Sequence, residues 1–342
     1  MLGAPVIAET VAAFLDGWPG PWTEDELFGT HDPEAVGEAF ARFCLAELGS
    51  PAAAGIFYEA SIGSVAGLEL VDGRRVVVKA HSPASPQGFL EAAVRIQAAL
   101  VQHGFPAPAP LLGPRPFGRT HATAEQLVDE GDYRDAHDPP VRAALAQALA
   151  RLVTLTSDLP RHGLEREQQT LPPGVLWPRP HHRMFDFEAT RAGTEWIDGL
   201  ATQAKELLGS PGECVVGHMD FTVKQCRFVG DELRIVYDWD SLGLMPEPEI
   251  VGNTAAHFTT TWKLEAPLIP TPDEARAYVA EYERARGGEF DRAERVRLGA
   301  QAVYSLAYGA RCEACREPTA TSFPSGSQRD GLARWGEEYF RL

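Results

Sequence analysis

The chain has 342 residues, 44% of them hydrophobic, and a formal net charge of −17 at pH 7. This length is enough for two lobes with their own cores, and the acidic balance argues against nucleic acid as a partner, because phosphate backbones bind clustered lysine and arginine. No run of 18 apolar residues exists, so we expect no membrane span. Five cysteines, an odd number, and an N-terminus without a basic signal segment favour a cytoplasmic location.

Two helices are expected in the first 50 residues. Apolar side chains between Val6 and Leu15 predict the first helix, and Asp32-Pro33 begins the second, which Gly49 ends. Because no linker follows them, we expect residues 1–50 to form a helical extension packed on the next lobe. A separate partner-binding module is the alternative.

A candidate phosphate-binding loop comes next, between Phe57 and Gly67. Its small residues Ser61, Gly63 and Ser64 would let backbone N–H groups approach phosphates closely. The segment lacks a Gly-x-Gly-x-x-Gly run, and an ordinary hairpin turn predicts the same sequence.

The segment Arg74 to Ala80 is predicted to be a strand that ends near a lysine, Lys79. Helical spacing of apolar residues then predicts a helix over Gln87 to Gln102. Glu91 is the one acidic residue of that helix, which makes it the candidate partner of Lys79. Two plainer interpretations stay open, a solvent-exposed lysine and a glutamate that complements the helix dipole.

Residues 107–117 are proline-rich, and we expect a loop there. Thr120 to Val128 is predicted to be a strand. Asp138-Pro139 has the pattern of a helix start, and the apolar stripe from Val141 to Val153 is interpreted as core packing.

The most informative segment is Val215 to Leu242, which contains His218-x-Asp220, a short loop ending at Gln225, a hairpin pattern, and then Asp238. A hairpin returns the chain on itself, so we expect Asp220 and Asp238 to lie close together. Phosphoryl transfer needs one carboxylate to orient the attacking hydroxyl and another to hold Mg²⁺. The alternative is a hairpin with surface aspartates.

This segment and the lysine strand resemble the aminoglycoside phosphotransferase family of small-molecule kinases. The resemblance covers about residues 55 to 310, with one departure: Gln225 stands where the family has Asn. It implies an α+β, two-lobed protein-kinase-like fold, with a small, mainly β N-lobe at residues 51–128 and a larger, mainly α C-lobe at residues 129–342.

The resemblance also implies roles for individual residues. The catalytic pair would be Asp220, the base, and His218. Mg²⁺ would be held by Asp238 and Gln225, with Asp240 as the rival of Asp238. The nucleotide, ATP or GTP, would contact Lys79 with Glu91, Ser61, Gly63, Ser64 and the backbone of the hinge residues Gln126, Leu127 and Val128.

The implied function is a kinase of a small hydroxylated molecule. Three alternatives stay open: an antibiotic-modifying enzyme with an aminoglycoside-like acceptor, a metabolic kinase of a sugar or amino-alcohol, and a nucleotide-binding pseudokinase. The net charge is compatible with a cationic acceptor, although solubility explains it equally well. Residues 176–187, rich in aromatic and basic side chains, are candidates to line the acceptor pocket or merely to cover the lobe. Helices are expected near 273–285 and 291–310; the sequence leaves the oligomeric state open.

Overall fold

A computed structural model describes residues 3–18, 20–165, 171–172, 174–210, 212–317 and 323–342. Residues 166–170 and 173, which precede the aromatic and basic stretch at residues 176–187, therefore lie outside the described residues. The chain divides into two compact units: unit 1 holds residues 1–102 and 107–129, and unit 2 holds residues 103–106 and 130–342. Of the helices described, none has the length and apolar character needed to cross a membrane.

Unit 1 is built on an antiparallel sheet with the strand order β1-β2-β3-β5-β4. The strands are β1 (Ala52–Ala60), β2 (Ser64–Leu70), β3 (Arg75–Ala80), β4 (Pro110–Phe117) and β5 (Thr120–Gln126). Valine side chains along β3 are buried, as their high β propensity and the position of this strand inside the sheet require. The predicted strands at residues 74–80 and 120–128 are confirmed.

The expectation of a loop at residues 107–117 is wrong, because β4 occupies Pro110–Phe117. Proline cannot donate to a sheet ladder, but β4 is an edge strand, where one side needs no donor. Its pairing with β5 is also interrupted twice by register shifts, between Pro110 and Leu112 and between Leu112 and Arg115. The prolines are thus accommodated by the position of the strand.

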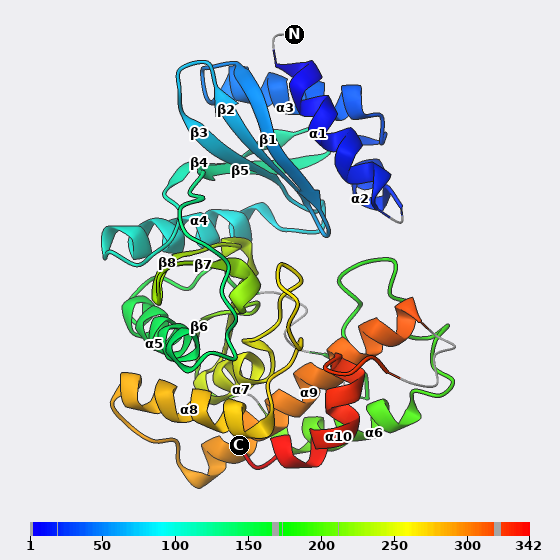
Figure 1. The fold of residues 1–342 in the computed structure, drawn as a ribbon, viewed down its shortest axis with the longest axis vertical. Helices are drawn as coiled ribbons and strands as arrows, with labels where there is room; N and C mark the ends of the chain where they lie inside the picture. Colours follow the sequence, from blue (N-terminus) through cyan, green and yellow to red (C-terminus); the bar gives the residue numbers. More distant parts are fainter. Residues whose placement is uncertain (1–2, 19, 166–170, 173, 211, 318–322) are drawn as a thin grey trace. The chain divides into compact units, whose positions relative to one another are not determined.

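Three helices precede the sheet: α1 (Ala4–Asp16), α2 (Trp22–Phe28) and α3 (Pro33–Glu47). The two predicted helices are present, and Asp32 caps α3 by accepting a 3.2 Å hydrogen bond from Ala35 N; α2 was not anticipated. Figure 1 shows α1 and α3 lying together beside the sheet, and their apolar side chains share one core with it. Phe40 of α3, for example, contacts the rings of Tyr58 and Phe117.

Between β3 and β4 lies α4 (Gln87–Gln102), which begins and ends where the sequence predicts. It packs against β4, and its buried side includes Phe89, Ile96 and Gln97. A glutamine among buried apolar residues requires hydrogen-bond partners, which are described below with the site.

Unit 2 is mainly helical. Its helices are α5 (Pro139–Thr156), α6 (Glu195–Leu208), α7 (Glu247–His257), α8 (Pro272–Arg286), α9 (Arg292–Arg316) and α10 (Gln328–Tyr339). The long helix α9 packs against α6, α7 and α10, and α5 packs against α8 (Figure 1). Two small antiparallel pairs complete the unit: β6 (Cys214–His218) with β9 (Leu242–Pro246), and β7 (Cys226–Val229) with β8 (Glu232–Val236).

The hairpin β7–β8 and the helices α5, α8 and α9 agree with the sequence-based prediction. The elements α6, α7, α10 and β9 were not predicted. Strand β9 is short and contains glycine and proline, Gly243 and Pro246, so its sequence has weak β propensity. It becomes a strand because its residues pair in register with β6.

The crossing of α1 and α3 gives a test of packing in unit 1. A Cβ atom on Gly37 would lie 2.8 Å from Ala4 O and 2.9 Å from Ala8 N. We therefore expect Gly37→Ala to destabilise the protein by about 1–3 kcal/mol through overpacking, despite the better helix propensity of alanine. Urea denaturation measures this change.

The matched control is Gly88→Ala in α4, where an added Cβ would meet nothing within 4 Å. There alanine should stabilise by about 0.4–1 kcal/mol. Equal changes for the two variants would show that α1 and α3 do not approach as closely as described.

Candidate active site

At the base of the hairpin β7–β8, one backbone hydrogen bond joins the His218-x-Asp220 loop to the segment that contains Asp238. Tyr237 N donates to Gln225 O at 2.8 Å, so the end of the His218-x-Asp220 loop lies beside the residue that precedes Asp238. At its other end, the loop is held by the pairing of β6 with β9, in which His218 lies opposite Leu242. The loop is therefore fixed at both ends by backbone hydrogen bonds.

His218 lies at the end of β6 and is fully buried, with the rings of Phe221 and Trp239 packed edge-on against it. Its Nε2 is 2.9 Å from Tyr237 O, and its Nδ1 accepts from Asp220 N at 3.3 Å. These partners require a neutral ring with the proton on Nε2. The enclosed ring has no open side for a substrate, so His218 is placed to hold the loop; the catalytic roles expected of His218 and Asp220 stay predictions.

Asp220 has one oxygen engaged and one open. Its Oδ2 accepts from Gln225 Nε2 at 2.7 Å and pairs with Lys224 Nζ at 2.9 Å. Within the described part of the chain, no donor lies within hydrogen-bonding distance of Oδ1. Oδ1 is therefore the oxygen that can accept a hydrogen bond from an incoming hydroxyl group.

The surroundings of Asp220 keep it ionised. Desolvation acts to raise the pKa of this carboxyl, but the Lys224 ammonium and the Gln225 amide outweigh that effect and lower the pKa below its usual value. An ionised carboxylate is what a proton acceptor must be at neutral pH.

Asp238 adopts a left-handed backbone conformation, with φ of 68°, and it is the one non-glycine residue with positive φ in the described ranges. Aspartate tolerates this region better than most residues, but the conformation is uncommon and is concentrated at functional sites. Its Oδ2 accepts from Ser241 Oγ at 2.7 Å and lies 3.5 Å from Gln225 Nε2. The turn therefore aims this carboxylate toward Gln225 and Asp220.

The residues present fit a magnesium ion that is shared with phosphates. Mg²⁺ is usually held by one or two protein oxygen ligands, with phosphate oxygens and waters completing the octahedron. Asp238 offers a carboxylate, and rotation of the terminal amide of Gln225 would present its oxygen; at present its NH₂ group faces Asp220 and Asp238. No group of three or more His, Cys, Asp or Glu residues among those described forms a metal cage by itself. Asp240 would be a rival because, two residues after Asp238 in a strand, it would lie on the same face. It lies instead in a 3-10 turn (Trp239–Ser241), so this reason does not hold.

In unit 1, Lys79 pairs with Glu125. Lys79 Nζ lies 3.5 Å from Glu125 Oε1, and both side chains are about nine-tenths buried, at 11% and 8% exposed. Sheet register explains the pair: Lys79 is opposite Thr123 and Val77 is opposite Glu125, which makes Lys79 and Glu125 diagonal neighbours on one face. The other oxygen of Glu125 accepts from Gln97 Nε2 of α4 at 2.8 Å.

The structure thus differs from the expectation that Glu91 holds Lys79. Glu91 is exposed, and its Oε1 accepts from Gln87 Nε2 at 2.9 Å, one turn earlier in α4. The helix turns Gln97 toward the sheet, so α4 contacts the lysine site through Glu125 and not through a carboxylate of its own.

The predicted phosphate-binding loop is the turn between β1 and β2. Ser61 is exposed at this turn, whereas Ser64 is fully buried at the start of β2 between Ala60 and Ala80. A Cβ on Gly63 would lie 2.5 Å from Ala80 O, so only glycine allows the turn to approach β3 this closely. Of the three expected residues, Ser61 and Gly63 are at the open end of the hairpin.

In the segment predicted to bind adenine, two backbone N–H groups already donate hydrogen bonds within unit 1. Gln126 N donates to Ala109 O at 2.8 Å, and Leu127 N donates to Arg75 O at 3.0 Å. An adenine contact through these two N–H groups would require those bonds to break. The structure therefore restricts any adenine contact of Gln126 and Leu127 to their carbonyl groups.

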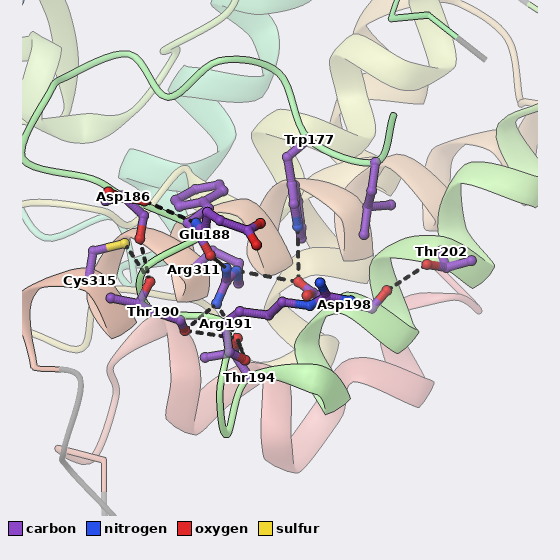
Figure 2. A network of polar contacts seen from close by, with 12 residues as sticks. Trp177, Asp186, Glu188, Thr190, Arg191, Thr194, Asp198, Thr202, Arg311 and Cys315 are labelled. Carbon is purple, nitrogen blue, oxygen red and sulfur yellow. Dashed lines mark hydrogen bonds and ion pairs between the residues drawn. The ribbon is translucent and has the colours of Figure 1, made fainter. Parts of the chain in front are cut away.

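The segment 174–191 lines a pocket of unit 2 with a volume of about 820 Å³, together with α6 and α9. Figure 2 shows how Arg311 of α9, only 1% exposed, holds the segment: it donates to Thr190 O at 2.9 Å and pairs with Asp198 at 3.3 Å. Trp177 Nε1 donates to the same Asp198 oxygen at 2.9 Å. The expected acceptor-lining residues therefore do border a pocket, and a buried arginine fixes its wall.

His181 joins this segment to α9. Its Nδ1 is 2.8 Å from Tyr308 Oη of α9. Burial and the charges of His182 and Lys224 together lower the pKa of His181 to about 4, and the charge of Asp220 opposes these effects.

Sequence reasoning missed three residues of these sites: Lys224, Glu125 and Trp262. Lys224 stands four positions after Asp220, in the 3-10 turn Val223–Gln225, and this short separation could have suggested the ion pair. Glu125 is a charged residue within a strand of small residues, which could have marked it as a partner for Lys79. Nothing in the sequence around Trp262 indicates that its ring faces Lys224, 4.5 Å from the ring centroid.

No protein-family model matches the chain, and no curated protein matches it. Solved structures do. An amicoumacin kinase in complex with AMP-PNP and Ca²⁺ is 11% identical, with a TM-score of 0.58 over 84% of this chain and 87% of the kinase. A spectinomycin phosphotransferase in complex with ADP and spectinomycin is 11% identical, with a TM-score of 0.53 over 89% and 93% of the two chains.

An aminoglycoside phosphotransferase from Alicyclobacillus acidocaldarius is 13% identical, with a TM-score of 0.50 over 83% of this chain and 88% of the relative. At these identities the likeness concerns the fold alone. The chain has the α+β, protein-kinase-like fold of the aminoglycoside phosphotransferases.

Proposed function

We propose that the chain is an ATP- or GTP-dependent phosphotransferase that moves the terminal phosphoryl group of the nucleotide to a hydroxyl group of a small molecule. The observation that carries the proposal is the arrangement of Asp220, Gln225 and Asp238. One carboxylate has an open oxygen, a second lies beside it in a strained turn, and an amide links them.

In the proposed reaction, the acceptor hydroxyl donates its hydrogen bond to Asp220 Oδ1. Its oxygen forms the new bond to the terminal phosphorus, the bond from that phosphorus to the bridging oxygen breaks, and the electron pair leaves with the nucleoside diphosphate. The hydroxyl proton passes to Asp220 Oδ1. The pair of donors on Oδ2 holds the carboxylate in one rotamer during this step.

We propose nucleotide-binding residues in each unit, taken by itself. Lys79 supplies a positive charge for the phosphates, and Glu125 with Gln97 fixes its position. Asp238 and Gln225 would hold Mg²⁺, which when bound neutralises phosphate charge. Gly63 is the proposed backbone contact of the turn between β1 and β2, because Ser61 N already donates to Gly63 O at 2.9 Å. Glu91 has no part in the nucleotide site that we propose.

Two kinds of kinase, antibiotic-modifying and metabolic, differ in the class of acceptor that they phosphorylate. An antibiotic-modifying enzyme would protect growing cells from its substrate, whereas a metabolic kinase would act on a sugar or amino-alcohol without such protection. Mass spectrometry of phosphorylated products from an acceptor panel, run beside growth tests with the same antibiotics, distinguishes them. The neighbours named above include kinases of antibiotics, which supports including those compounds in the panel.

Removing the base tests the proposal directly. Asp220→Asn should lower kcat by at least about a hundredfold while leaving nucleotide affinity nearly unchanged, because a general base acts on the acceptor hydroxyl and not on nucleotide binding. Turnover is measured by coupled detection of the nucleoside diphosphate, and affinity by calorimetry with AMP-PNP. Wild-type kcat in this variant would contradict the assignment.

Glu125 and Glu91 form a matched pair for testing the lysine site. Glu125→Gln should lower kcat/KM for ATP by roughly tenfold or more, because a buried lysine without its carboxylate favours the neutral form and loses its position. Glu91→Gln changes the same charge on the exposed side of α4 and should leave kcat/KM unchanged. The assignment fails if the two variants behave alike.

Gln225 decides between an active kinase and a nucleotide-binding pseudokinase. First-shell Mg²⁺ distances are strict, about 2.0–2.1 Å, so Gln225→Asn should preserve or raise activity, and Gln225→Ala should lower activity and increase the Mg²⁺ requirement. Mg²⁺ titrations of nucleotide binding and of turnover measure both effects. If Gln225→Ala matched the wild type in both, Gln225 would not be a ligand; absence of any phosphorylated acceptor as well would favour the pseudokinase.

A further inference from the structure

Lys224, which contacts the proposed base Asp220, is the first of several cationic side chains that lie over aromatic rings. Lys224 Nζ, bound to Asp220 Oδ2, also lies over the face of Trp262, 4.5 Å from the ring centroid. The neighbouring Lys263 lies over Tyr133 at 5.8 Å, and Arg227 lies over the same ring at 4.6 Å. We call these five residues, Lys224, Trp262, Lys263, Tyr133 and Arg227, the cation–ring row.

Trp262 is unusual in this row because its side chain is 67% exposed, whereas Lys224 is only 17% exposed. A tryptophan that is mostly in solvent contributes little to a hydrophobic core. One part of its ring covers Lys224, and the remaining ring surface stays open to a ligand. An open aromatic face separated from the base by a single side chain is suited to a planar group of an acceptor bound at Asp220.

The positive charge of Lys224 limits which acceptors can use this place. An aromatic ring attracts cations, but Lys224 already occupies the near side of Trp262, and a second ammonium beside it would meet like-charge repulsion. A carboxylate, a phosphate or a neutral hydrogen-bond acceptor would instead pair with Nζ.

The charged residues that line the pocket of segment 174–191 also have a positive balance. Apart from the mutually paired Arg311 and Asp198, its charged lining residues are three arginines and two carboxylates: Arg179, Arg183, Arg191, Asp186 and Glu188. The whole chain has the opposite balance, with 31 basic and 48 acidic residues. The charged residues that line this pocket therefore have a slight positive balance, opposite in sign to the net charge of the protein.

We infer that Trp262 and Lys224 determine acceptor specificity, and that the acceptor is a hydroxylated molecule with a planar group and a neutral or negative charge near the reacting hydroxyl. This inference rests on the proposed function and opposes the cationic acceptor that the net charge permitted. It excludes polycationic aminoglycosides as the preferred substrates.

Three para-substituted phenols with side chains of similar size test the charge preference: tyramine, 4-hydroxyphenylacetamide and para-hydroxyphenylacetate, which carry a positive, a zero and a negative charge. Binding to the full chain is measured by calorimetry, with saturation-transfer NMR for weak complexes. The neutral and negative probes should bind at least about tenfold more tightly than tyramine. Equal or tighter binding of tyramine overturns the inference, as does the absence of binding by all three.

Variants assign the preference to the two residues. Lys224→Met should reduce the ratio between the negative and neutral probes to near one, and Lys224→Arg, which keeps the charge, should restore it. Trp262→Ala should weaken all three probes by a similar factor, while Trp262→Phe should retain most of the affinity. Glu265→Gln, on the same loop as Trp262, is the control and should leave the order unchanged; a charge order that persists in Lys224→Met overturns the assignment.

The binding measurements separate this inference from the proposed function, because they need neither nucleotide nor turnover. A kinase that phosphorylates polycations better than neutral aromatic acceptors would support the proposed function and overturn the inference. A charge order that matches our expectation, in a chain that transfers no phosphoryl group, would support the inference about binding and overturn the reaction.

Discussion

The carboxylates of Asp220 and Asp238 approach one another in unit 2, and the amide of Gln225 lies between them. Two carboxylates at close range oppose each other's ionisation unless donors or a cation intervene. Here one NH₂ group faces both, at 2.7 Å and 3.5 Å, and Lys224 adds a positive charge on the side of Asp220. The amide therefore offsets part of the repulsion between the two carboxylates, which we propose to be a base and a metal ligand.

The position of that amide depends on backbone bonds formed elsewhere. Tyr237 N holds Gln225 O, and His218, through its two ring nitrogens, ties Tyr237 O to the backbone of Asp220. The turn at Asp238, with φ of 68°, is the strained element that this network holds in place. A buried neutral histidine suits this task because it donates on one side and accepts on the other without adding a charge beside two carboxylates.

Local sequence patterns predicted the parts of the fold that depend on local chemistry. The hairpin β7–β8 follows from turn residues between β-rich runs, and α4 and β3 follow from apolar spacing. Features set by the pairing of distant segments were not predictable. Glu125 meets Lys79 only because β3 and β5 pair in one register, and the proline-rich β4 is a strand only because it lies at the sheet edge.

The distinction between what the sequence shows directly and what depends on the folded arrangement also applies to electrostatics. A net charge is a sum over the whole surface, and water and salt screen exposed charges beyond about 10 Å. An acceptor at Asp220 therefore responds to the few groups within that range, among which Lys224 is in direct contact with the base. Because Lys224 is brought there by the turn that also places Gln225, the geometry that arranges the two carboxylates sets the charge of the acceptor side as well. Reaction and acceptor preference would then depend on one short loop, Asp220 to Gln225, and on the tryptophan that covers it.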